Sequence, residues 1–145
     1  MVWCWKTINK NIPVSFCSPQ SVRVNDGNWH HLCSTWNSQD GAYKIYKDGN
    51  VVGSGTIATG KTIPGNGIWV LGQDQDSRGG AFVKFQAFQG EMVEVNIFDR
   101  VLSSEEISEM SQSCALSQKG NVKSWNDFKS GVKGNIEVVN ATCCR

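Results

Sequence analysis

Residues 73–80 concentrate oxygen-bearing side chains: two carboxylates and two amides fill the first four positions, and a Gly pair ends the stretch. Hard cations such as Ca²⁺ take several carboxylate, amide and carbonyl oxygens as ligands. In an extended backbone Asp74 and Asp76 point to the same side, while Gln75 turns its side chain away and leaves its carbonyl oxygen beside them. The stretch predicts a calcium site, although Asp and Gly are also typical of an ordinary solvated turn.

His30 and His31 are adjacent, which raises the question of catalysis or metal binding. They lie in an alternating run over residues 29–38, and successive side chains of a strand point to opposite faces. The two imidazoles therefore cannot bind one ligand together, and no nucleophile or oxyanion arrangement accompanies them. We expect packed or hydrogen-bonded histidines with a structural role, in a protein that is not an enzyme.

The length, composition and net charge of the chain limit the classes of protein to which it can belong. With 145 residues the chain is long enough for one domain with a real core. Its formal charge is +1, from 14 basic and 13 acidic residues, so no strong field gathers nucleic acid or an anionic membrane. No apolar run is long enough to cross a bilayer. We expect neither nucleic-acid binding nor membrane insertion.

The cysteines indicate an oxidising compartment. Six of them stand at positions 4, 17, 33, 114, 143 and 144, and none forms a Cys-x-x-Cys pair of the kind found in zinc and thioredoxin-type sites. Residues 140–142 form a glycosylation sequon with Asn140 as the acceptor. Both features favour a secreted, extracellular protein. Because residues 1–6 lack the features of a signal peptide, we expect the chain to be incomplete or part of a longer one.

Short apolar or alternating runs, separated by turn signals, predict strands over residues 2–5, 14–17, 29–38, 43–47, 51–53, 68–72 and 91–98. In the last of these, Val93, Val95 and Ile97 are expected to share one face and to lie in the core. Regularly spaced short strands of this kind predict an all-β fold, a two-sheet antiparallel β-sandwich.

A single short helix is well signalled near residues 103–112. Ser103 as N-cap and Glu106 at the third helical position form a capping box. Leu102 and Ile107 are placed to form the hydrophobic staple around this helix start.

Two motifs resemble one known family. Residues 31–38 (HLCSTWNS) fit the pentraxin signature, His-x-Cys-x-Ser/Thr-Trp-x-Ser/Thr, and residues 71–80 (LGQDQDSRGG) resemble the calcium loop of the same family at a fitting distance. The flanking segments agree at residues 25–31, 86–91, 96–100 and 120–125. The resemblance runs from about residue 22 to the end, leaves residues 1–21 poorly matched, and looks closest to neuronal and other long pentraxins.

The resemblance implies a single domain over residues 1–145 with a jelly-roll sandwich of the laminin-G or concanavalin kind, a helix on one sheet and calcium on the other. Pentraxins are secreted recognition molecules of innate immunity or cell contacts, often ring-shaped homo-oligomers, and are not enzymes. They bind phosphocholine, phosphoethanolamine or carbohydrate surfaces through bound calcium.

Carried over by position, Asp74 and Asp76 match carboxylate ligands, Gln75 matches a carbonyl donor, and Gln86 matches an amide ligand of a second calcium. Val83 stands where the family has an acidic ligand, and the next residue is a lysine. The family also supplies an early Asp/Asn pair, which this chain begins too late to contain, so we expect an incomplete domain. Because ligand charge sets calcium affinity, we expect one calcium position with an incomplete shell and a doubtful second one.

The resemblance also bears on the disulfides. Cys33 lies in the signature and its family partner lies upstream, for which Cys4 and Cys17 are the alternatives here. Cys114 with Cys144 resembles the late bridge of long pentraxins, and it leaves one cysteine of the C-terminal pair for an intermolecular bond.

Two functions follow from the sequence. Residues 73–80 favour calcium-dependent, lectin-like recognition. Val83 and the spare cysteine favour the alternative, a calcium-independent adhesion module of a larger extracellular protein or receptor ectodomain.

Overall fold

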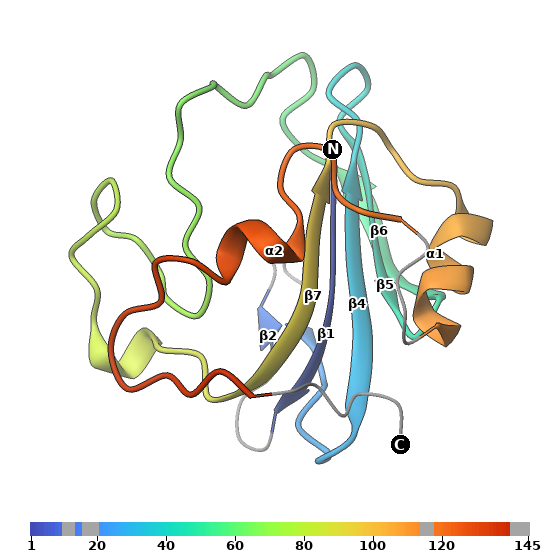
Figure 1. Ribbon diagram of the computed structural model, residues 1–145. Coiled ribbons are helices and arrows are strands. Elements are labelled where there is room, and N and C mark those ends of the chain that lie inside the picture. Colours follow the sequence, from blue (N-terminus) through green and yellow to red (C-terminus); the bar gives the residue numbers. More distant parts are fainter. Residues whose placement is uncertain (10–13, 16–20, 114–117, 140–145) are drawn as a thin grey trace.

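The computed structural model describes residues 1–9, 14–15, 21–113 and 118–139, which form an antiparallel β fold with short helices (Figure 1). The strands are β1 (Val2–Asn9), β2 (Val14–Ser15), β3 (Ser21–Val22), β4 (Trp29–Trp36), β5 (Ala42–Lys47), β6 (Asn50–Thr56) and β7 (Gly90–Phe98). The helices are α1 (Ser104–Gln112), α2 (Trp125–Phe128) and the 3-10 turn η1 (Lys84–Gln86). The predicted all-β class is confirmed.

One five-stranded sheet in the order β6-β5-β4-β1-β7 forms the centre of the fold, and β2 pairs with β3 in a small second sheet. Strands β4, β5 and β6 follow one another as hairpins, and every neighbouring pair in the sheet is antiparallel. The β5–β6 turn uses Asp48 at φ 51° and Gly49 at φ 80°, the conformation that favours a two-residue hairpin. Strand β1 then joins β4 to β7, which lies far away in sequence.

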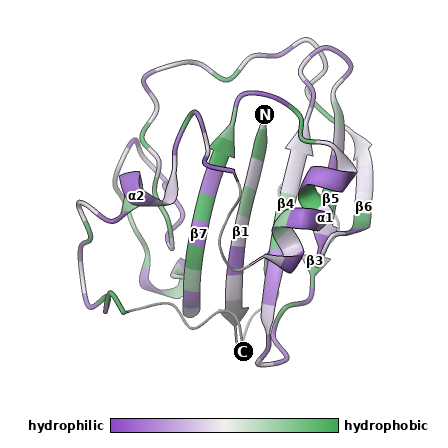
Figure 2. Ribbon diagram, turned by 45° about the vertical axis from the view of Figure 1, so that its right-hand side comes forward, coloured by the Kyte–Doolittle hydropathy of each residue, from purple (hydrophilic) through white to green (hydrophobic). Residues whose placement is uncertain are grey.

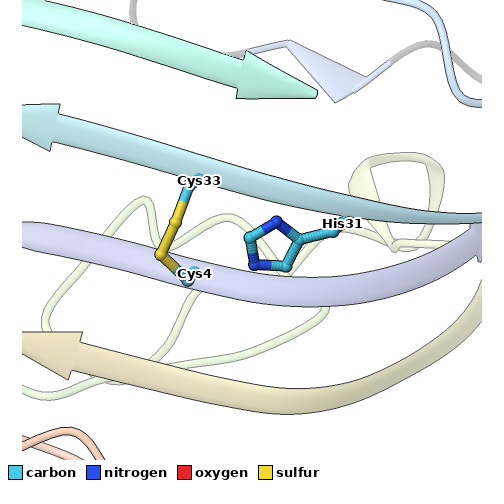
Figure 3. Close-up of side chains that lie close together, drawn as sticks. All are labelled: Cys4, His31 and Cys33. Atoms are coloured by element: carbon cyan, nitrogen blue, oxygen red, sulfur yellow. A yellow bond between two sulfur atoms is a disulfide. The ribbon is translucent and has the colours of Figure 1, made fainter. Parts of the chain in front are cut away.

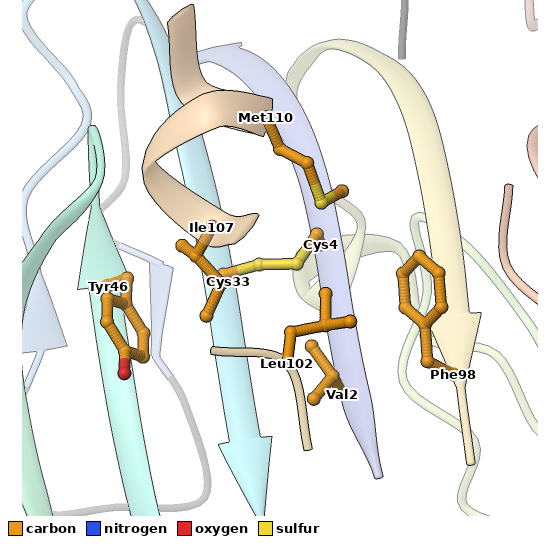
Figure 4. Close-up of a cluster of buried hydrophobic side chains, with 8 residues drawn as sticks. All are labelled: Val2, Cys4, Cys33, Tyr46, Phe98, Leu102, Ile107 and Met110. Atoms are coloured by element: carbon orange, nitrogen blue, oxygen red, sulfur yellow. A yellow bond between two sulfur atoms is a disulfide. The ribbon is translucent and has the colours of Figure 1, made fainter. Parts of the chain in front are cut away.

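Each face of this sheet carries its own core. On the first face, α1 lies over the sheet (Figure 2), and buried strand residues meet Leu102 and the buried side of α1 (Figure 4). This cluster consists of Val2, Cys4, Cys33, Tyr46, Phe98, Leu102, Ile107 and Met110. On the opposite face, Leu32 and Ile45 pack with Val22 and Val24 from the segment that precedes β4.

Strand β7 contains a β-bulge, marked by Glu94 at φ 60°. Val93 pairs with Lys6 of β1. Ile97 pairs with Trp3. Lys6 and Trp3 are three residues apart in β1, so their side chains point to opposite faces of the sheet, and so do those of their partners Val93 and Ile97. The three apolar residues predicted to be buried in this strand are buried. The prediction that they share one face is wrong, because the extra residue of the bulge reverses the alternation.

Residues 57–83 contain no strand, so the strand predicted over residues 68–72 is wrong. Ile68 is 48% exposed, and its carbonyl oxygen accepts a hydrogen bond from the Gln75 side chain at 3.0 Å. A strand needs a neighbour to satisfy its backbone groups, and here a loop side chain takes that place.

Helix α1 begins as the capping box predicts. The Ser103 hydroxyl accepts from the Glu106 N–H at 3.2 Å, and the Glu106 carboxylate accepts from the Ser103 N–H at 2.8 Å. Leu102 and Ile107 are both buried in the same cluster. A second capping box, Ser124 with Asp127, starts the short helix α2, which was not predicted although the same signal is present in the sequence.

Replacing Ser103 tests the helix start. Ser103→Ala removes one of the two reciprocal hydrogen bonds, and we expect the free energy of unfolding to fall by about 1 kcal/mol. Urea unfolding followed by circular dichroism measures the change. Ser103→Asp, which keeps an acceptor at the cap, is the matched control and should stay within about 0.5 kcal/mol of the parent. Equal losses in both variants would contradict a capping role.

Candidate functional site: the loop at residues 73–80

The side chain of Gln75 closes the loop. Its amide nitrogen donates to the Ile68 carbonyl at 3.0 Å, and its amide oxygen accepts from the Gly79 N–H at 2.8 Å. Ser77 and Gly80 exchange backbone hydrogen bonds across the bend. Gly79 has φ +69°, a conformation that side-chain-bearing residues rarely adopt. Gln75 therefore fixes the loop through its side chain.

The two carboxylates of the loop face solvent. Asp74 and Asp76 are both exposed, and one oxygen of Asp74 accepts from the Gln75 N–H at 2.9 Å. Within the described part of the chain, the other Asp74 oxygen and the whole Asp76 carboxylate make no hydrogen bond. Three oxygens of negative side chains are thus available to a ligand or an ion.

Two amide oxygens at this site are buried and lack a partner among the described residues. They are Oε1 of Gln86, which was predicted to bind a metal, and Oε1 of Gln73, which was not. The Gln73 amide nitrogen donates to the Val83 carbonyl at 3.4 Å, and the Phe88 N–H donates to the Gly72 carbonyl at 2.9 Å. These bonds hold the start of the loop against residues 83–88. The signal for Gln73 was its place in the same run of oxygen-bearing residues.

This donor set fits a hard cation in kind. A buried amide oxygen without a partner carries a free-energy cost that a cation or a water molecule relieves, and amide and carboxylate oxygens are ligands that Ca²⁺ accepts. However, this set of ligands contains few negatively charged groups. Within the described ranges no three acidic, histidine or cysteine side chains converge at this loop. Any ion here would depend on Asp74 and Asp76 for its negative ligands.

His30 lies elsewhere, clamped between two carboxylates. Its Nδ1 lies 2.7 Å from Asp48 and its Nε2 lies 2.9 Å from Asp26. The pKa of Asp26 is lowered to about 2, first by the Asn28 N–H and then by His30. The Asp48 carboxylate also accepts from the His31 N–H at 2.9 Å. His30 thus ties the loop before β4 to the β5–β6 turn, which is the structural role predicted for it.

His31 points into the first-face core, where its neighbours are sulfur and a buried lysine. Cys4 and Cys33 pair directly across β1 and β4 and form a disulfide with a Cα–Cα distance of 4.1 Å (Figure 3). Burial and the nearby Lys6 ammonium lower the pKa of His31 to about 4. Lys6 in turn donates to the Ser113 carbonyl at the end of α1. The structure thus gives Cys4, rather than Cys17, as the partner of Cys33.

The remaining predicted site residues lie outside the described residues. They are Cys17, Cys114, Cys143, Cys144 and the sequon asparagine Asn140. Within the described ranges, no helix is long and apolar enough to cross a membrane.

Comparison with known proteins places the chain in a family. The sequence model of the Pentaxin family matches residues 7–140. Sushi, von Willebrand factor type A, EGF and pentraxin domain-containing protein 1 of Rattus norvegicus is 44% identical over 79% of this chain, which spans 3% of that protein. Neuronal pentraxin-2 of Cavia porcellus is 43% identical over 77% of this chain and 26% of its own length.

A further relative and a solved structure agree. Neuronal pentraxin-1 of Homo sapiens is 38% identical over 84% of this chain and 28% of its own length. The native heptameric SAP-like pentraxin from Limulus polyphemus superposes with a TM-score of 0.63 at 20% identity, over 86% of this chain and 75% of that one, which shows the shared β-sandwich fold. By family model and by sequence identity, this chain belongs to the pentraxin family.

Proposed function

We propose that this chain is an extracellular, non-enzymatic recognition domain that binds phosphocholine-like or carbohydrate ligands through Ca²⁺ at residues 73–80. The observation that supports this function best is a pair of buried amide oxygens, of Gln73 and Gln86, that have no hydrogen-bond partner among the described residues, together with the exposed carboxylates of Asp74 and Asp76. In this proposal the two carboxylates and the Gln75 carbonyl hold the first ion, and Gln86 belongs to a weaker second position.

The bound ion would supply a positive centre for the ligand. The exposed side of the loop is open to solvent at Asp74 and Asp76, so an ion there keeps coordination positions for oxygens of the ligand. Phosphate oxygens or neighbouring sugar hydroxyls fit such positions because Ca²⁺ accepts six to eight oxygen ligands in flexible geometry. An extracellular setting is consistent with the Cys4–Cys33 disulfide.

Retention on phosphocholine-coated beads tests the proposal. We expect the protein to bind the beads in millimolar Ca²⁺ and to elute with EDTA. The double variant Asp74→Asn/Asp76→Asn keeps the shape of the loop but removes its charge, and should lower retention by about tenfold or more. The matched control Glu109→Gln/Glu137→Gln removes two exposed carboxylates elsewhere and should bind like the parent.

Three outcomes would contradict the proposal in different ways. If the protein stays on the beads in EDTA, binding does not depend on calcium, and that part of the proposal is wrong. Equal losses in the loop variant and the control would show a general charge effect. If the protein is not retained on phosphocholine, phosphoethanolamine or carbohydrate beads, the proposed class of ligand is wrong.

A second function has a specific observation in its favour. Val83 brings no carboxylate to the site, and its carbonyl oxygen is already taken by the Gln86 N–H at 3.0 Å and by the Gln73 side chain. One relative is named for several other domains besides its pentraxin domain. We therefore also consider a calcium-independent adhesion module of a longer extracellular protein. Calorimetry that detects no calcium binding at millimolar concentration would favour it.

We also propose that the chain forms a ring of identical copies, because the Limulus polyphemus protein with the same fold is heptameric. Size-exclusion chromatography with light scattering measures this directly. A mass equal to one chain at micromolar protein would contradict the ring.

A further inference from the structure

The first-face core contains a cluster of metal-binding side chains that the proposed function does not use. Sγ of Cys4, Sγ of Cys33 and one ring nitrogen of His31 all lie within 4.8 Å of one another. All three residues are buried, with His31 only 3% exposed. Figure 3 shows the imidazole of His31 lying beside the two sulfur atoms, over the paired strands β1 and β4.

The imidazole of His31 has no hydrogen-bond partner for either ring nitrogen among the described residues. Buried polar groups in proteins are nearly always paired, and an unpaired one costs about 1–3 kcal/mol. The strand register explains why the imidazole lies beside the two sulfur atoms, since His31 is directly opposite Lys6 and on the same face of β4 as Cys33. The register does not explain why a polar ring is kept beside two sulfurs.

We propose that, once the Cys4–Cys33 disulfide is reduced, the two thiolates and the His31 imidazole bind one monovalent copper ion. Reduction breaks the S–S bond, and an external thiol or phosphine supplies the two electrons while two protons complete the thiols. Binding of Cu⁺ then displaces both thiol protons to solvent, as binding to thiolate ligands requires. The oxidised protein cannot form this site because both sulfurs are held in the disulfide.

The donor set favours Cu⁺ over Zn²⁺. Thiolate sulfur selects soft ions, and two of the three ligand atoms here are sulfurs. Structural zinc sites are closed by four ligands, and no fourth acidic, histidine or cysteine side chain joins the three within the described ranges. A trigonal set of two sulfurs and one nitrogen, surrounded by apolar side chains, suits an ion of low coordination number.

The charges at the site also favour a monovalent ion. Two thiolates with Cu⁺ carry a net charge of −1, and the buried Lys6 ammonium lies close enough to act on His31. The sum of the copper site and Lys6 is therefore neutral. The same ligands with Zn²⁺ would be neutral, so that site would gain no attraction from the Lys6 charge.

Copper titration of the full chain tests the proposal. The other four cysteines are first replaced by serine, so that Cys4 and Cys33 are the only thiols. After reduction with a phosphine and its removal without oxygen, we expect the protein to withdraw one Cu⁺ per chain from the chelator bicinchoninate. The oxidised protein should withdraw none. Equal uptake by both forms would overturn the proposal.

Variants identify the ligands. Cys33→Ser should abolish the tight uptake, and His31→Leu, which keeps both thiols, should weaken it by about tenfold or more. Lys61→Gln, at an exposed position outside the strands that gains no sulfur, is the control and should change nothing. X-ray absorption of the reduced, loaded protein should show two sulfurs and one nitrogen. Unchanged affinity in His31→Leu, or a sulfur-only spectrum, would overturn the assignment of the imidazole.

The effect of Cu⁺ on folding distinguishes binding at this site from nonspecific binding of Cu⁺ to exposed thiols. If reduction unfolds the protein, one equivalent of Cu⁺ should restore the far-ultraviolet circular dichroism; if the reduced protein stays folded, Cu⁺ should raise its melting temperature. Absence of both effects would overturn the proposal. Tighter binding of Zn²⁺ than of Cu⁺ would overturn the choice of ion. The loop at residues 73–80 is untouched by all of these variants.

Discussion

Cys4→Ala should lower the free energy of unfolding by about 3–4 kcal/mol, because it removes a cross-link that closes a 29-residue separation between β1 and β4. Most of this effect arises in the unfolded chain, where the cross-link restricts the conformations that β1 can explore. A loss of this size is a large part of the roughly 5–15 kcal/mol typical of a folded domain. Urea unfolding of the oxidised protein measures it.

The pattern of losses distinguishes a disulfide from two independent buried thiols. Cys4→Ala, Cys33→Ala and the double variant should all lose nearly the same free energy, since any one of them breaks the bond. Cys17→Ala is the matched control, because the sequence left Cys17 as the alternative partner of Cys33. A large loss in Cys17→Ala with a small loss in Cys4→Ala would contradict the pairing seen in the structure.

Lowering the pH from 6.5 to 4 should destabilise the oxidised protein by about 3 kcal/mol through His31 alone. Its pKa in the folded protein is about 4, below its ordinary value of 6.5, first because of burial and then because of the Lys6 charge. The unfolded chain therefore binds a proton in this range that the folded protein does not. The stabilisation is complete above pH 6.5, is lost progressively towards pH 4, and changes little further below that.

The variant His31→Leu should remove this pH dependence and stay at least as stable as the parent at pH 7, because it replaces a buried imidazole that has no hydrogen-bond partner among the described residues with an apolar side chain. Asp26 and Glu106, whose pKa values are lowered to about 2, act mainly below pH 4.5, so their effect falls in a separate range. Urea unfolding at pH 4.5, 5.5 and 7 gives the slope. An unchanged slope in His31→Leu would contradict a buried neutral imidazole.

Local signals in the sequence predicted local structure well. The capping box at Ser103 and Glu106 located α1, and strand alternation placed His30 and His31 on opposite faces of β4, where His30 is paired with carboxylates and His31 lies in the core. Those features depend on residues a few positions apart. The sequence alone therefore contained what was needed.

Features that depend on a distant partner were not predictable in the same way. The bulge at Glu94 arises where β7 meets β1, and nothing in an alternating run marks a non-glycine residue for a positive φ. The choice of Cys4 for Cys33 depends on the β1–β4 register. Residues 68–72 have the composition of a strand, but a strand forms only where a neighbour supplies hydrogen bonds, and no described strand pairs with them.

The candidate calcium site lies between these cases. The density of oxygen-bearing residues identified Asp74, Gln75 and Asp76, and the resemblance to pentraxins added Gln86. The burial of Gln73 Oε1 depends on residues 83–88 folding back against the loop, as the Gln73–Val83 and Gly72–Phe88 hydrogen bonds show. That contact could not be read from the loop itself.

Calorimetric titration of Ca²⁺ into the parent protein and into Asp74→Asn/Asp76→Asn tests the central proposal most directly. We predict saturable binding of one ion by the parent at up to millimolar Ca²⁺, with the Glu109→Gln/Glu137→Gln control indistinguishable from it and no heat above dilution for the loop variant. A parent protein that takes up no ion, or a loop variant that takes it up equally well, would contradict the proposal that residues 73–80 hold the calcium.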